Sequence, residues 1–179
     1  MKLVDVPSWS RKALQGITYW IGHRRSLYDH YPLGESAFVA ELCNLIFAHL
    51  GKDQTLRCEV MYSELADGKS LPSIFGKRAR ADIVVSERSS AGNDPTPKFI
   101  IEVKRGSPTK KDIDIDLQRL AAIARLNGTF RTMLFVISEA KRLGRFVNSE
   151  GQSVSGPHSI PNDRGHYGVR KYFKAGLAF

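Results

Sequence analysis

The sequence predicts an α/β protein with a mixed central sheet flanked by helices. Three observations support this fold class. Apolar residues recur at helical spacing near residues 8–28, 35–50 and 110–126. Short runs rich in Val, Ile and Phe lie between and after these stretches, as expected for strands. The order helix, helix, strand, strand, strand, helix, strand favours a single sheet covered by helices.

Two helices are expected at the start of the chain. The first spans about 8–28, where Ser8 is available as an N-cap and apolar residues form a rough stripe. Its other side is basic, and we interpret that side as a solvated helix face. The second spans about 35–50 and ends where Gly51 follows.

Glu35 occupies an unusual place on the second helix. In a projection at 100° per residue it falls at the centre of the apolar arc, whereas Glu41 falls toward solvent. An unpaired carboxylate on a buried stripe costs free energy, so Glu35 needs a reason to lie there. A residue in the first turn can also fray outward or favour the helix N-terminus electrostatically. Periodicity alone leaves this plain explanation and a role in a site both open.

Four strands and a further helix complete the predicted domain. The strands are the runs LRCEVMYS (56–63), RADIVVS (80–86), KFIIEVKR (98–105) and TMLFVIS (132–138). The third run is mostly apolar on both faces, which is typical of a central strand. Between the last two lies a helix over about 110–126. Its core face is expected to carry Ile113, Leu117, Leu120 and Ala124. HYGVRKYF (166–173) is a candidate edge strand.

Composition restricts the function classes. Hydrophobic residues at 42% and charged residues at 25% indicate a globular domain rather than a disordered chain. No apolar run is long enough to cross a bilayer, and the N-terminus lacks the apolar stretch of a signal peptide, so we expect a cytoplasmic protein without a membrane partner. Cys43 and Cys58 are too few for a disulfide scaffold or a zinc site, and we expect both to be reduced core residues.

The charge balance favours a polyanionic partner. The 27 Lys and Arg residues exceed the 18 Asp and Glu residues and give a formal net charge of +9. A field of that sign attracts nucleic acid or an anionic membrane surface. A soluble protein that is merely basic is the alternative.

Three charged residues interrupt the apolar strands. Glu102 and Lys104 are two positions apart on FIIEVKR and therefore project from the same face of the sheet. Asp82 lies within the apolar run ADIVV. If the two strands are neighbours, all three side chains can converge at one point. A structural ion-pair patch on a generic α/β domain is the alternative.

Such a cluster suits phosphodiester hydrolysis. Asp82, Glu102 and the carbonyl of Val103 offer hard oxygen ligands for Mg²⁺, which lowers the pKa of a bound water. Lys104 can orient or deprotonate the attacking water, or stabilise the charge that develops. The sequence leaves these roles open.

The spacing of these residues resembles the PD-(D/E)XK nuclease superfamily. Nineteen residues separate Asp82 from the segment Glu102-Val103-Lys104. Gly34-Glu35 at the head of a helix resembles the leading helix of these folds, and KKDIDIDLQRLAAI resembles the helix that follows their Glu-x-Lys strand. The resemblance covers roughly residues 34–138. Ala81 stands where many members have Pro.

The resemblance implies a restriction-endonuclease-like fold and a metal-dependent endonuclease that hydrolyses DNA, in restriction, defence, repair or mobile-element processing. Mg²⁺ is the implied cofactor, with Mn²⁺ able to substitute. The implied metal ligands are Glu35, Asp82, Glu102 and Val103, and Lys104 is the catalytic lysine. The early Glu of the leading helix favours Glu35 over Glu41. Alternative functions are an RNA-cleaving toxin, a junction resolvase, or an inactive nucleic-acid-binding module.

Seven further residues are candidates for the site or its surroundings. Asp116 and Gln118 lie on the helix after the Glu-x-Lys strand, where we prefer a solvent-facing pair to a place in the site. Glu59 is interpreted as structural. Phosphate contacts are expected from the basic loop before the Asp82 strand, although a solvated loop is the alternative. Its basic residues are Lys69, Lys77, Arg78 and Arg80.

We expect a single nuclease domain over residues 1–179. Its parts are an N-terminal helical extension (1–33), a catalytic core (34–138) and a basic C-terminal part (139–179). A small single-site nuclease that cuts both strands of a duplex uses two copies, so a homodimer is a further expectation.

Overall fold

The fold was analysed in a computed structural model, which describes residues 7–27, 33–88, 94–105, 110–138 and 172–176. The helices are α1 (Ser8–Leu27), α2 (Glu35–Phe47), α3 (Tyr62–Leu65) and α4 (Lys110–Leu126), with a 3-10 turn η2 (Ser73–Phe75). The strands are β1 (Gln54–Met61), β2 (Arg80–Glu87), β3 (Thr96–Arg105), β4 (Arg131–Ser138) and β5 (Tyr172–Gly176).

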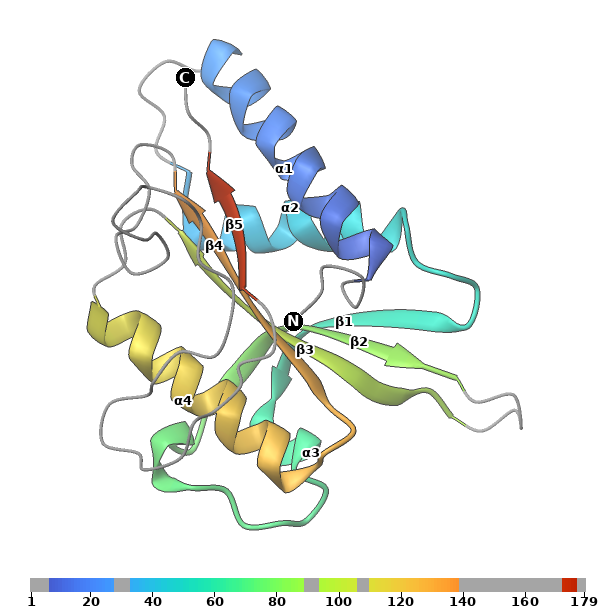
Figure 1. Ribbon diagram of the computed structural model, residues 1–179, viewed down its shortest axis with the longest axis vertical. Helices are drawn as coiled ribbons and strands as arrows, with labels where there is room; N and C mark the ends of the chain where they lie inside the picture. The colour runs from blue at the N-terminus through green and yellow to red at the C-terminus, as the bar shows by residue number, and fades with distance from the viewer. Residues whose placement is uncertain (1–6, 28–32, 89–93, 106–109, 139–171, 177–179) are drawn as a thin grey trace.

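The five strands form one sheet in the order β1-β2-β3-β4-β5 (Figure 1). The pairs β1–β2 and β2–β3 are antiparallel, whereas β3–β4 and β4–β5 are parallel. Helix α4 connects β3 to β4, because a parallel pair requires a crossover. The α/β class and the mixed sheet flanked by helices are therefore confirmed.

Two apolar cores cover the two faces of the sheet. On one face α1 and α2 pack over side chains such as Ile83, Ile101 and Phe135. On the other face α4 packs over Ile100 and Leu134. Strand β3 contributes Phe99, Ile101 and Val103 to one core and Ile100 to the other, which explains why its middle is apolar on both faces.

Most elements agree with the predicted ranges, and the differences have local causes. The first predicted strand ends at Met61, because Tyr62 starts α3. On α4, Ile113, Leu117 and Leu120 are buried as predicted, but Ile123 is buried while Ala124 is half-buried. The last strand begins at Tyr172; residues 166–171 of the predicted run lie outside the described residues.

The prediction that both cysteines lie in the core is confirmed for Cys43 and wrong for Cys58. Cys43 is buried on α2, but Cys58 is exposed. Cys58 lies on β1, an edge strand of the sheet, where cover from neighbouring elements is incomplete. Within the described parts of the chain, no helix is both long and apolar enough to span a membrane.

Candidate active site

Asp82 lies where the hydrogen-bonding ladders around β2 become irregular. The regular β2–β3 pairing ends at Ile83 and Ile101. Beyond that point the Val103 N–H donates to Asp82 Oδ2 at 2.6 Å. On the other side, Glu59 of β1 is skipped in the register with β2 and has a φ of 53°, in the left-handed region. The side chain of Asp82 therefore replaces a backbone partner at the end of the β2–β3 ladder.

Glu102 is buried beside Asp82. It is 3% exposed, its carboxylate accepts a hydrogen bond from the Tyr62 hydroxyl, and its carboxyl group shares a hydrogen bond with Asp82. Burial raises the pKa of Glu102 well above its usual value, and the nearby charges of Asp82 and Asp116 raise it further. Burial and the neighbouring carboxylates therefore both oppose ionisation of Glu102.

The pKa of Asp82 shows the same conflict between burial and charge. Burial raises it to about 6. The hydrogen bond from the Val103 N–H, the hydrogen bond with Glu102 and the Lys104 charge oppose that rise only in part. Asp82 and Glu102 together form a site that stabilises positive charge.

Lys104 lies between two carboxylates from different helices. Its Nζ is 3.1 Å from Asp116 Oδ2 on α4 and 3.4 Å from Glu35 Oε1 at the start of α2. Burial lowers the pKa of Lys104, but Asp116, Glu35 and Asp82 outweigh that effect, so its pKa is raised. Lys104 is therefore a cation at neutral pH in this arrangement.

Asp116 corrects an expectation from the sequence. We expected it to face solvent, but its side chain is 4% exposed and lies against Lys104. Burial raises the pKa of Asp116, and Lys104 and Arg119 lower it in part; Arg119 Nη1 is 3.4 Å from Asp116 Oδ1. The reason is the helical period, because Asp116 follows Ile113 by three positions and precedes Leu120 by four, on the buried stripe of α4.

The structure brings Glu35 to the cluster and leaves Glu41 outside it. The Glu35 side chain is 43% exposed rather than buried, since it is the first residue of α2, and it contacts Lys104. Glu41 instead accepts a hydrogen bond from Asn44 at 3.4 Å on the exposed side of the same helix. The four residues predicted as catalytic therefore lie close together in the structure. They are Glu35, Asp82, Glu102 and Lys104.

Tyr62 is the site residue that the sequence analysis missed. It is fully buried at the start of α3, its ring lies 4.6 Å from that of Phe75, and its hydroxyl donates to Glu102. Burial and the neighbouring carboxylates raise the pKa of Tyr62 well above its usual value, so the phenol keeps its proton. An aromatic residue at a strand end carries no signal that distinguishes this contact from ordinary packing.

The basic loop residues are spread over the surface before β2. The Lys69 Nζ donates to the Leu126 carbonyl at 2.6 Å, at the end of α4 remote from Asp116. Lys77 and Arg78 are exposed, and Arg80 is exposed at the start of β2, two positions before Asp82. Residues 139–171 and 177–179 of the basic C-terminal part lie outside the described residues.

The carboxylates of the cluster match the needs of a divalent cation in part. In the described ranges, no three His, Cys, Asp or Glu side chains have the arrangement of a metal site. Mg²⁺, however, is usually held by one or two carboxylates and keeps several waters. Asp82 and Glu102 supply two adjoining hard-oxygen ligands whose shared charge a cation would neutralise. These residues fit such an ion.

Comparison with known proteins adds no relative: no family model, no curated protein and no solved structure matches the chain. The functional proposal below therefore depends on the chemistry of the site alone.

Proposed function

We propose that the protein is a Mg²⁺-dependent endonuclease of restriction-endonuclease-like fold that hydrolyses DNA phosphodiester bonds. The observation that supports this most strongly is the buried Asp82–Glu102 carboxyl pair next to the Lys104 cation. Burying like charges together is unfavourable unless something offsets the cost, and a bound divalent cation does so. The proposal includes a cytoplasmic location and a role in restriction, defence, repair or mobile-element processing.

Each residue has a defined part in this proposal. Asp82 and Glu102 would hold the metal with the Val103 carbonyl, and Glu35 would join them from α2. When bound, Mg²⁺ supplies a water of lowered pKa and neutralises charge on the phosphate. Lys104 remains protonated, so it orients the attacking water and stabilises the negative charge that develops on the phosphate oxygens.

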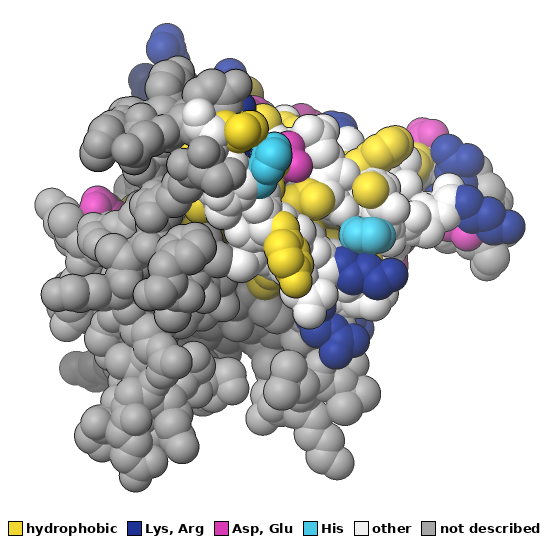
Figure 2. Space-filling view, turned by 90° about the horizontal axis from the view of Figure 1, so that it is seen from above, with side chains coloured by type: hydrophobic (Ala, Val, Ile, Leu, Met, Phe, Trp, Pro, Cys, Tyr) yellow, Lys and Arg dark blue, Asp and Glu magenta, His cyan; other side chains and the backbone are white. Residues whose placement is uncertain are grey.

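The proposal of a DNA partner is based on the net charge of the chain. The proposal of a homodimer is based on exposed apolar residues. The chain has a formal net charge of +9, and Lys and Arg side chains lie toward the edges of the described surface in Figure 2, where acidic side chains are also present. Tyr19 and Leu27 on α1 and Phe47 on α2 are the exposed large hydrophobic residues of the described chain. A second copy can cover such residues and place two sites on the two strands of a duplex. Sedimentation of the purified protein tests this: a monomer at micromolar concentration contradicts the dimer.

Cleavage assays test the activity and separate it from its alternatives. The purified protein is incubated with supercoiled plasmid, linear duplex, branched DNA and RNA, each with Mg²⁺ or EDTA. We expect cleavage of duplex DNA with Mg²⁺ and none with EDTA. Lys104→Ala should lose at least about 100-fold in rate, because a charge that acts in the transition state is removed. Lys98→Ala, on the same strand but at its other end, is the matched control and should cleave normally.

Several outcomes contradict the proposal. Cleavage that survives EDTA excludes the metal, and equal rates for Lys104→Ala and Lys98→Ala exclude the site. Cleavage of RNA alone or of branched DNA alone assigns the same residues to a different substrate. Binding without cleavage of any substrate identifies an inactive nucleic-acid-binding module.

A further inference from the structure

The two cysteines of the chain lie against each other although they are far apart in sequence. Cys43 on α2 and Cys58 on β1 are separated by 15 positions, and their Sγ atoms are 2.9 Å apart. Both are free thiols, and the chain has no other cysteine. A disulfide has an S–S distance of about 2.05 Å, so the two sulfurs need to approach by less than about 1 Å to bond.

We propose that Cys43 and Cys58 are a modification site at which peroxide oxidises the two thiols to an intramolecular disulfide between α2 and β1. The pair differs in access, because Cys58 is exposed and Cys43 is buried. Peroxide therefore reaches Cys58 first, and Cys43 is the resolving thiol. An exposed cysteine next to a resolving one is the arrangement found at redox-sensitive sites.

The reaction balances in two steps. The Cys58 thiolate attacks one oxygen of hydrogen peroxide, the O–O bond breaks, and hydroxide leaves, which yields a sulfenic acid. The Cys43 sulfur then attacks the Cys58 sulfur, the S–O bond breaks, and the leaving hydroxide takes the Cys43 proton as water. In total, two thiols lose two electrons and two protons, and one peroxide becomes two waters.

A metal is a poorer occupant of this site than a disulfide. A structural zinc ion takes four ligands, usually cysteine or histidine. Only two thiols are present, and the described residues offer no third His, Cys, Asp or Glu in a metal-binding arrangement with them. Proximity of the two sulfurs in a chain with two cysteines favours their mutual oxidation.

Oxidation should add a covalent link between two elements that pack against each other and already share the contact between the two sulfurs. The disulfide closes a short loop between α2 and the edge strand β1. Such a loop stabilises the folded chain, and for a chain of this size we expect Tm to rise by roughly 5 °C or more. The inference does not depend on the proposed nuclease activity, since neither cysteine belongs to the catalytic cluster.

Thiol counting and intact mass test the site directly. The reduced full-length protein is treated with a few equivalents of hydrogen peroxide, and its thiols are titrated after unfolding. We expect both thiols to disappear, the intact mass to fall by two hydrogens, and a monomer to remain on a non-reducing gel. Dithiothreitol should restore both thiols and the original Tm.

Single variants distinguish the roles of the two cysteines. Cys43→Ser should stop at the sulfenic acid of Cys58, which dimedone traps as an adduct. Cys58→Ser should lose its remaining thiol at least about tenfold more slowly, because Cys43 is buried. Two thiols still titratable after treatment, disulfide-linked dimers, or sulfinic acid on Cys58 of the unmutated protein would overturn the inference.

Discussion

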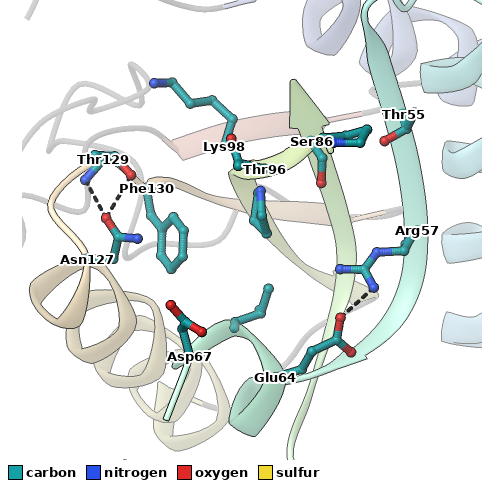
Figure 3. A pocket seen from close by; sticks show the side chains of 13 residues that line it. Thr55, Arg57, Glu64, Asp67, Ser86, Thr96, Lys98, Asn127, Thr129 and Phe130 are labelled. Atoms are coloured by element: carbon teal, nitrogen blue, oxygen red, sulfur yellow. Dashed lines mark hydrogen bonds and ion pairs between the residues drawn. The ribbon is translucent and has the colours of Figure 1, made fainter. Parts of the chain in front are cut away.

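The two ends of β3 differ in where charged side chains lie. At its carboxyl end, Glu102 and Lys104 meet Asp116 of α4 in the buried cluster. At its other end, a cavity of about 760 Å³ opens between the sheet and the end of α4 (Figure 3). The cavity is lined by Thr55, Arg57, Glu64, Leu65, Asp67, Ser86, Pro95, Thr96, Pro97, Lys98, Asn127, Thr129 and Phe130. It holds charges of both signs.

The buried cluster is a better candidate for chemistry than the cavity. In the cavity, Arg57 and Glu64 point toward each other, and their side chains are 49% and 55% exposed. Water screens such a pair, so its charges cost little free energy and perturb each other little. In the cluster, burial shifts the pKa values of Asp82, Glu102 and Asp116 upward. A cavity shows where a molecule has room to bind. Buried carboxylates with raised pKa values indicate where a bound cation would lower the free energy.

The largest effect expected from this comparison is loss of activity in Glu102→Gln. The amide cannot replace a carboxylate as a metal ligand, so we expect the cleavage rate to fall by about 1,000-fold. Glu64→Gln, in the cavity at the other end of the sheet, is the matched control and should retain its rate. Cleavage of a labelled duplex at saturating Mg²⁺ gives both numbers. Equal cleavage rates for the two variants would mean that Glu102 is no more important for activity than Glu64. The two ends of β3 would then not differ in function.

The next effect is a dependence of stability on pH that Asp82 imposes. Its pKa is about 6 in the folded chain against 3.8 ordinarily, so the folded state holds a proton that the unfolded state releases as pH rises from about 4 to about 6. The free energy of unfolding should fall over that window, by about 2 kcal/mol after allowance for partial exposure. Asp82→Asn should show a smaller fall, because only the raised pKa values of Glu102 and Asp116 then contribute, as measured by urea unfolding in EDTA.

An exposed carboxylate and added Mg²⁺ provide two controls for that measurement. Asp67→Asn removes an exposed carboxylate of the cavity, outside the buried cluster, and is the matched control for Asp82→Asn. Mg²⁺ at pH 7 should restore stability to the unmutated protein but not to Asp82→Asn, because the ion binds the ionised carboxylates. Parallel curves for Asp82→Asn and the unmutated protein between pH 4 and 7 would contradict the assigned pKa.

The strands and most of the cluster could be predicted from the sequence for a physical reason. A charge inside an apolar strand is costly, so Asp82, Glu102 and Lys104 stand out in the sequence alone. The alternation of side chains along β3 then places Glu102 and Lys104 on one face. The α/β class follows from hydrophobic periods and from the order of the elements.

The missed contacts depend on how elements pack. Asp116 was expected to face solvent, although its helical spacing from Ile113 and Leu120 is the same kind of signal that selected Glu35. Glu35 in turn is more exposed than its place on the apolar arc suggested, because the first turn of α2 extends past the core. The Tyr62–Glu102 hydrogen bond joins residues 40 positions apart, and no local pattern contains it.

A smaller effect is expected from the hydroxyl of Tyr62. Tyr62→Phe keeps the ring and its packing on Phe75 but removes the donor that orients the Glu102 carboxylate. Partners of metal ligands typically contribute about 10- to 100-fold in metal affinity, so we expect Mn²⁺ binding to weaken by that factor. Calorimetric titration of the protein with Mn²⁺ measures this. The cleavage rate should recover at high metal concentration, whereas a purely structural defect would not.

Tyr19→Phe is the matched control for that measurement. Tyr19 lies on α1 and is 80% exposed, so removal of its hydroxyl should leave Mn²⁺ affinity unchanged. If Tyr62→Phe and Tyr19→Phe bind Mn²⁺ equally well, the hydrogen bond to Glu102 does not position a metal ligand.

The smallest effect should come from the ion pair at the cavity end. Arg57→Ala removes the partner of Glu64, but both side chains are about half-exposed, so each charge is solvated whether or not the other is present. Such pairs contribute about 0–1 kcal/mol to stability. We therefore expect the urea midpoint to change little and the cleavage rate to stay the same. A loss above about 2 kcal/mol would mean that water does not screen this pair. The ion pairs at the two ends of β3 would then differ in how deeply they are buried and not in how strongly their charges interact.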